Sequence, residues 1–179
     1  MSKYYIGAEF TNRAGSKFTI VEKCLESRYW KVRFETGYVT VAKEPNILYG
    51  KVKDYFLPSV YGIGYLGSSQ KIPQRESGTL LRAKYDLWAN MLKRCYGGYK
   101  DSWNADYNHI EVHPQWLNFC VFAQEIEEVK GYEAWLQDTT LCLDKDLAGK
   151  FLYSKNTCVF ITNAENLSEA GLRRWAKMD

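Results

Sequence analysis

Two short strands and a helix are predicted from residues 141–166, whose sequence is LCLDKDLAGKFLYSKNTCVFITNAEN. Apolar and β-branched residues gather at Leu141–Asp144 and again at Thr157–Thr162, and the polar segment between them is typical of a loop. We expect a helix to follow directly and to carry Asn166. This order places the Asp144 carboxylate at the end of the first strand and the Asn166 amide on the helix.

The clearest helix upstream of this stretch is predicted at residues 80–97. Its apolar side chains recur at three- and four-residue steps, Lys84 falls on the same face, and Gly97 and Gly98 end the run. The opposite face is polar and cationic, with Arg82, Asn90, Lys93 and Arg94. Between this helix and the C-terminal strands, the sequence predicts a short strand at residues 110–112 and a second helix at residues 114–122 with proline in its first turn.

The first 60 residues predict a small β-module. Runs rich in β-branched and aromatic residues are separated by turn signals and lie at residues 18–21, 29–34 and 38–41. In the second run the pleat places Lys31 and Arg33 on one face and Trp30 and Val32 on the other. We expect an SH3-like sheet or partial barrel with one basic, aromatic face. Residues 61–79 have the Gly, Ser and Pro content of a linker, and residues 80–179 form a second, α+β domain.

Composition sets broad limits on the class of protein. The chain has 179 residues, of which 46% are hydrophobic and 25% charged, so it is neither disordered nor fibrous. No apolar run approaches the roughly 18 residues of a membrane span, and the N-terminus lacks a signal-peptide core, so we expect a cytoplasmic protein. Residues 1–80 carry 12 basic and 7 acidic side chains. That balance suits a nucleic-acid partner and equally an ordinary solvated surface.

Cysteine and histidine offer few metal ligands. None of the five cysteines forms a C-x-x-C pair, which argues against a thiolate zinc site, and the odd count argues against a disulfide framework. We interpret them as small buried apolar residues. The two histidines, His109 and His113, flank residues 110–112. They are either surface residues on a strand edge or, with Glu111 or Asp106, ligands of a metal site.

The motifs along residues 80–167 follow a recognisable order. They are Tyr85-x-x-Trp88-x-x-Met91-Leu92-x-Arg94-Cys95-Tyr96, then Trp116-x-x-Phe119-x-x-Phe122, then Leu143-Asp144-Lys145-Asp146, and finally Cys158-x-Phe160-x-Thr162 with Asn166. In this order and spacing the chain resembles the phage-encoded HNH endonucleases of the homing type. The resemblance implies a helical segment followed by a degenerate ββα-metal element, with a variable β-module at the N-terminus.

Carried over residue by residue, the resemblance implies that Asp144 and Asn166 are ligands of Mg²⁺ or Mn²⁺. Lys145 occupies the position of the general-base histidine, and Thr157 stands where an asparagine usually orients that histidine. A lysine ammonium is protonated at neutral pH, so it binds phosphate well but does not readily take a proton from water. The resemblance therefore implies weak or lost phosphodiester cleavage. Without the resemblance, Asp144 and Asp146 are better interpreted as turn carboxylates that cap a hairpin loop, and with it the two interpretations are even.

Besides a fully active nicking endonuclease, which Asp144 and Asn166 favour and Lys145 and Thr157 oppose, two functions remain open. The first is a phage protein of HNH endonuclease-like fold that binds double-stranded DNA in the host cytoplasm, by phosphate contacts from Lys31, Arg33, Lys93, Arg94, Arg173 and Arg174. The alternative is a non-enzymatic interaction protein that reuses a nuclease scaffold against a host defence or transcription protein. Cations exposed on strands and helices fit phosphate contact and plain solvation alike.

Overall fold

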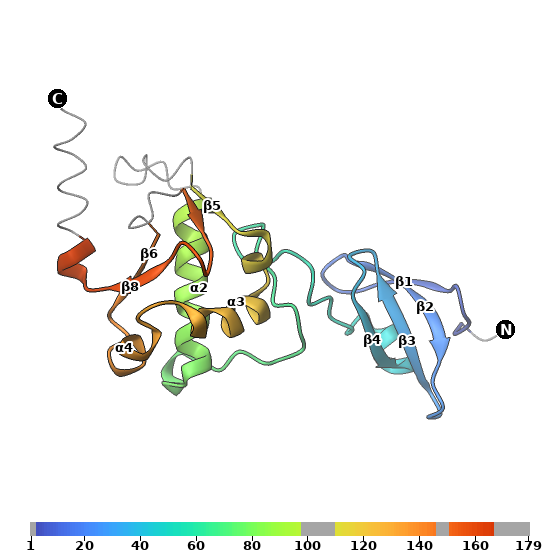
Figure 1. Cartoon of the computed structure of the whole chain (residues 1–179). Helices are drawn as coiled ribbons and strands as arrows, with labels where there is room; N and C mark the ends of the chain where they lie inside the picture. Colours follow the sequence, from blue (N-terminus) through green and yellow to red (C-terminus); the bar gives the residue numbers. More distant parts are fainter. Residues whose placement is uncertain (1–2, 98–109, 146–150, 167–179) are drawn as a thin grey trace. The chain divides into compact units, whose positions relative to one another are not determined.

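The computed structural model describes residues 3–97, 110–145 and 151–166, and the chain divides into two compact units, Met1–Leu57 and Pro58–Asp179 (Figure 1). Each unit has its own hydrophobic core. The first unit holds an antiparallel four-stranded sheet, and the second holds helices and two small two-stranded sheets. The prediction of a mixed α and β chain that opens with a β-module is confirmed. Within the described residues, no helix combines the length and apolar character that a membrane crossing needs.

The sheet of the first unit runs in sequence order, as β1 (Glu9–Thr11), β2 (Lys17–Lys23), β3 (Tyr29–Phe34) and β4 (Val39–Lys43). The alternation predicted for β3 is observed, because every second residue from Trp30 to Phe34 is buried. Val32 lies opposite Ile20 on β2 and Thr40 on β4. A short helix, α1 (Glu44–Leu48), follows with Pro45 in its first turn.

Aromatic rings pack along the inner face of this sheet. Phe18 and Phe34 meet with their ring centroids 5.0 Å apart, and Phe10 and Tyr38 extend the row on either side. Ile20 and Val32 are fully buried beside them. Burial of each such side chain contributes roughly 1.5–3 kcal/mol to the folding free energy. This face therefore stabilises the sheet, and the other face stays available to solvent.

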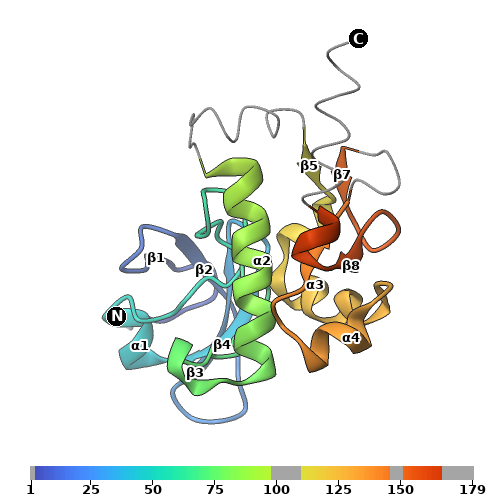
Figure 2. The same ribbon diagram turned by 90° about the vertical axis from the view of Figure 1, so that its left-hand side faces the viewer.

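The second unit is organised around α2 (Leu80–Tyr96), whose start is capped by the Thr79 hydroxyl, which accepts a hydrogen bond from the Arg82 amide. Trp88, Met91 and Leu92 are fully buried on its inner face. Figure 2 shows α3, α4 and the short strands on one side of α2. The remaining helical elements are η1 (Arg75–Ser77), η3 (Pro114–Leu117), α3 (Phe119–Glu125), η4 (Ile126–Glu128) and α4 (Tyr132–Gln137).

Four short strands complete the second unit. β5 (Glu111–Val112) runs parallel to β7 (Leu152–Tyr153), and β6 (Cys142–Asp144) runs antiparallel to β8 (Val159–Ile161). Asp144 ends β6 opposite Val159. Residues 163–166 then turn into a helix. The strand pair and the helix start that the sequence predicted are therefore present, whereas α1, α4 and β7 were not predicted.

Part of the segment predicted as a linker, residues 61–79, packs onto the second core through Ile63, Leu66 and Ile72. The amide of Tyr65 donates to the Leu117 carbonyl at 2.9 Å. A Cβ at Gly64 would lie 2.3 Å from the Leu92 side chain, so glycine is needed for this close approach to α2. One of the glycines that predicted a linker, Gly64, therefore permits close packing against α2.

Candidate functional site

Two of the sequence-predicted site residues meet at one buried ring in the second unit. Lys145, just past β6, places its Nζ 5.6 Å from the ring centroid of Tyr153 on β7. Arg94, in the last turn of α2, places its Cζ 5.9 Å from the same centroid. Tyr153 is only 1% exposed, so the two cations lie around a ring inside the unit. The parallel pairing of β5 with β7 holds this ring in place.

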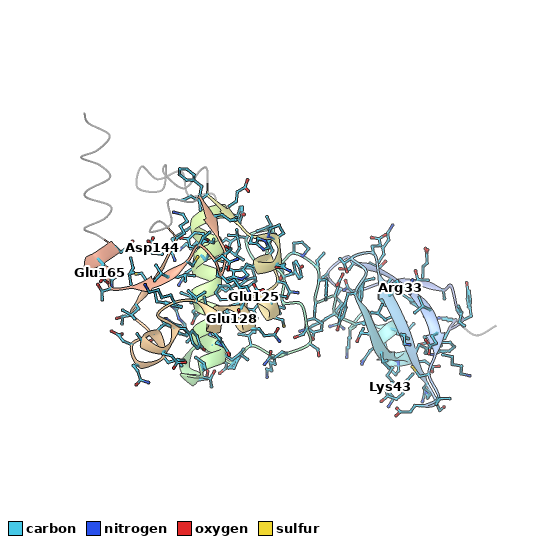
Figure 3. The ribbon with its side chains drawn as sticks, in the orientation of Figure 1. Arg33, Lys43, Glu125, Glu128, Asp144 and Glu165 are labelled. Atoms are coloured by element: carbon cyan, nitrogen blue, oxygen red, sulfur yellow. The ribbon has the colours of Figure 1, made fainter. Side chains whose placement is uncertain are left out.

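Asp144 and Lys145 are both buried, with 5% and 3% of their surface exposed. Figure 3 labels Asp144 on this unit. Charged side chains are rarely buried to this extent, because removal of each ion from water costs several kcal/mol before compensation. Residues 144 and 145, which the sequence motif singled out, are therefore two consecutive buried polar side chains at the end of β6.

Two thiols lie near this pair. Burial raises the pKa of Cys158 to about 12, and the Asp144 charge adds to that rise while Lys145 opposes it. Burial likewise raises the pKa of Cys95 to about 11, against the opposing charges of Arg94 and Lys145. Both thiols therefore stay protonated at neutral pH, which makes them inert as nucleophiles and as metal ligands. The prediction that the cysteines are buried is confirmed for Cys158 and wrong for Cys24, Cys95, Cys120 and Cys142, which are half-buried.

Thr157, which stands where the resemblance places an orienting asparagine, hydrogen-bonds within its own turn. Its hydroxyl donates to the Leu152 carbonyl at 2.5 Å and accepts from the Ser154 amide at 3.0 Å. The Ser154 hydroxyl lies a further 3.0 Å away, and both side chains are buried. The Thr157 hydroxyl thus fixes the turn between β7 and β8. This turn helps to position Tyr153, whose ring lies beside Lys145.

Asn166 lies on the helical turn after β8, where its backbone amide donates to the Thr162 carbonyl at 3.1 Å. Thr162 and Glu165 form a capping box, because the Glu165 carboxylate accepts from the Thr162 amide at 2.8 Å and the Thr162 hydroxyl accepts from the Glu165 amide at 3.2 Å. These hydrogen bonds hold the pKa of Glu165 below its usual range. The Glu165 carboxylate therefore serves the helix start.

The predicted pair of metal ligands, Asp144 and Asn166, stays a prediction. Among residues 3–97, 110–145 and 151–166, no three His, Cys, Asp or Glu side chains gather as a metal site would require. Asp106, His109 and Asp146 lie outside the described residues, and His113 occupies the N-cap position of η3 without a side-chain cap hydrogen bond.

The outer face of the first sheet carries the other predicted cations. Lys31 is paired with Glu22, with Nζ and Oε2 2.6 Å apart, and this hydrogen bond, followed by the charge of Glu22, raises the pKa of Lys31. Arg33 is exposed and, within the described part of the chain, makes no ion pair. It lies opposite Thr19 on β2 and Val39 on β4. Of the two predicted cations on β3, Arg33 is therefore the one available to a ligand.

Lys43, the last residue of β4, lies on the same face and was not predicted from the sequence. It is exposed, it forms no ion pair with any described residue, and its Nζ lies 5.6 Å from the ring centroid of Tyr29. Figure 3 labels Arg33 and Lys43 on the sheet. Extension of the strand predicted at residues 38–41 by two positions would have identified Lys43 as a further cation on this face. The first unit carries 10 Lys and Arg against six Asp and Glu, so the face belongs to a basic unit.

Comparison of the chain with protein-family models, with curated proteins and with solved structures gives no match. The resemblance to HNH endonucleases therefore rests on the motifs of residues 80–167 alone. Of the other cations named from the sequence, Lys93 is exposed on α2, Arg94 is half-buried, and Arg173 and Arg174 lie outside the described residues. Tyr153 was not predicted as a site residue, because its place beside two cations depends on the parallel pairing of β5 with β7.

Proposed function

We propose that the protein binds double-stranded DNA, with the outer face of the β2–β3–β4 sheet as its main contact. The observation that carries this proposal is the pair Arg33 and Lys43, which are exposed on one sheet face and not neutralised by a described acidic side chain. A cation that already pairs with a carboxylate, as Lys31 does with Glu22, gains less from a phosphate. Cations without such a partner release counterions from DNA and supply affinity with little sequence preference.

The second unit supports the further proposal that phosphodiester cleavage is weak or lost. The antiparallel β6–β8 pair, with Asp144 at the end of β6, and the capped helix turn that follows are the features that support this proposal. At the position of the general base, however, stands Lys145, and Thr157 uses its hydroxyl within its own turn. A positioned general base typically contributes about 10²–10⁴-fold to rate, and this element lacks one.

The experiment is fluorescence anisotropy with a labelled 20-base-pair duplex and the full chain. We expect Arg33→Ala and Lys43→Ala each to weaken binding several-fold. Arg28→Ala is the matched control, because Arg28 is 65% exposed yet paired with Glu44, and we expect it to bind as the wild type does. Equal losses in all three variants, or no binding by the wild type at low salt, would reject the sheet face as a DNA contact.

A protein partner is the second candidate, because Val39 and Val41 are 40% and 54% exposed on the same sheet face. Apolar side chains next to exposed cations suit a protein interface as well as a nucleic-acid one. Val41→Asp separates the two candidates when it is compared with Val41→Lys. A DNA-binding face gains affinity from the lysine and loses it with the aspartate, whereas an apolar protein interface is disrupted by both.

A further inference from the structure

The first unit carries a second basic region, away from the strands of its sheet. We name it the Arg13–Tyr49 corner, and it consists of the β1–β2 turn (residues 12–16) and the segment after α1 (residues 49–53). Backbone and side-chain hydrogen bonds join the two. The Arg13 amide donates to the Gly50 carbonyl at 2.9 Å, the Arg13 Nε donates to the Tyr49 carbonyl at 3.2 Å, and the Asn12 Nδ2 donates to the Val52 carbonyl at 3.1 Å.

The corner is held in one conformation. Asn12 is buried, and its Oδ1 accepts from the amides of Ala14 and Ser16 at 3.0 and 2.8 Å. Gly50 has a φ of +62°, and a Cβ there would lie 3.1 Å from the Thr11 carbonyl oxygen, so the backbone approach requires glycine. A ligand that binds here meets side chains whose backbone is already ordered, which lowers the cost of binding.

The charge of the corner has a single sign. Arg13, Lys51 and Lys53 are exposed, residues 12–16 and 49–53 contain no Asp or Glu, and none of the three cations pairs with an acid among the described residues. Val52 is buried between the two lysines, so Lys51 and Lys53 lie on the same side of the segment. Three cations held close together without a counter-charge favour a polyanion.

An exposed aromatic ring lies among these cations. Tyr49 is 60% exposed, and the Nζ of Lys51 lies 5.8 Å from its ring centroid. An open aromatic ring beside cations suits single-stranded nucleic acid, because the ring stacks on a base and the cations contact the adjacent phosphates. An acidic peptide would use the cations but would leave the ring without a planar partner.

From these observations we infer that the Arg13–Tyr49 corner binds an unpaired segment of nucleic acid, with Tyr49 as the stacking platform and Arg13, Lys51 and Lys53 as phosphate contacts. This site lies apart from the sheet face proposed to contact duplex DNA and does not depend on it. A protein with both surfaces would prefer DNA in which a duplex adjoins a single-stranded stretch.

The test is anisotropy of the full chain with a labelled 12-nucleotide oligothymidylate, with the 20-base-pair duplex measured in parallel. We expect Tyr49→Ala to weaken oligothymidylate binding by roughly five-fold or more, and Tyr49→Phe to retain most of the affinity. Tyr5→Ala is the matched control, because Tyr5 is also 60% exposed, and it should bind as the wild type does. The Lys51→Ala, Lys53→Ala double variant should lower the salt slope of log K by about 1.4, at roughly 0.7 per phosphate on a single strand.

Several results would overturn the inference. They are absence of oligothymidylate binding by the wild type, equal effects of Tyr49→Ala and Tyr5→Ala, and an unchanged salt slope in the lysine variant. Poly-glutamate that binds with the same affinity and the same dependence on Tyr49 would assign the corner to an acidic protein segment instead. The duplex arm separates this site from the sheet face, because Arg33→Ala should weaken duplex binding and leave oligothymidylate binding nearly unchanged.

Discussion

Replacement of Lys84 by methionine should destabilise the second unit by about 2–3 kcal/mol, although a charge is removed from its interior. The Lys84 ammonium lies between elements, where it donates to the Ala123 carbonyl at 2.8 Å, pairs with Glu127 and sits 5.3 Å from the ring centroid of Tyr132. Its side chain is only 7% exposed, whereas that of Glu127 is 56% exposed. Methionine keeps the apolar stem but leaves the carbonyl without its charged donor, a loss of roughly 1.5–3 kcal/mol.

The matched change on the other side of the pair should cost much less. Glu127→Gln acts on an exposed partner, and exposed ion pairs contribute about 0–1 kcal/mol. Urea unfolding followed by tryptophan fluorescence measures both variants, because Trp88, Trp116 and Trp135 are buried in the second unit and Trp30 belongs to the first. A Lys84→Met protein as stable as the wild type, or a Glu127→Gln protein equally destabilised, would refute this account of the contact.

Three further outcomes are expected. Burial raises the pKa of Cys158 in the folded state from 9.0 to about 12, so the stability that this thiol contributes is fully present below pH 9 and is lost as the pH rises towards 12. Between pH 8 and pH 10, the unfolding free energy of the wild type should therefore fall by about 1.4 kcal/mol more than that of Cys158→Ala, as measured by urea unfolding. Gly50→Ala should destabilise the first unit by roughly 1–3 kcal/mol in thermal melts, more than Gly15→Ala, whose added Cβ meets open space at a similarly positive φ. In a supercoiled-plasmid assay with Mg²⁺ or Mn²⁺ the wild type should nick slowly or not at all, and Lys145→His should nick faster; vigorous wild-type cleavage that survives Asp144→Ala would reject the assignment of this site.

The elements predicted correctly are those whose side-chain periodicity reports one buried face. The alternation in residues 29–34 predicted β3, and the three- and four-residue spacing from Leu80 predicted α2, including the inward position of Lys84. α1 and α4 are five and six residues long, which is too short for a helical period to show. β7 has only two residues and pairs with a strand some 40 positions earlier, a contact that no local pattern encodes.

The candidate sites were predicted less completely than the fold, because they too depend on contacts between residues far apart in the sequence. The motif around Asp144 and Lys145 was visible in the sequence, but the place of Lys145 beside the Tyr153 ring depends on the parallel β5–β7 pair. The Arg13–Tyr49 corner joins residues 36 positions apart through a hydrogen bond from the Arg13 side chain to the Tyr49 carbonyl, and no local pattern links Arg13 with Lys51 and Lys53. Likewise, the neutralisation of Lys31 by Glu22 depends on the strand register, which the pattern of β3 alone does not give.

The central claim, that the sheet face contacts the phosphates of duplex DNA, is tested most directly by the salt dependence of binding. The affinity of the full chain for the 20-base-pair duplex would be measured between about 50 and 200 mM salt for the wild type and for the Arg33→Ala, Lys43→Ala double variant. At roughly 0.9 per phosphate contact, the slope of log K against log salt should be shallower in the double variant by about 1.8. Parallel salt dependences for the two proteins, or wild-type binding that is insensitive to salt, would contradict the claim.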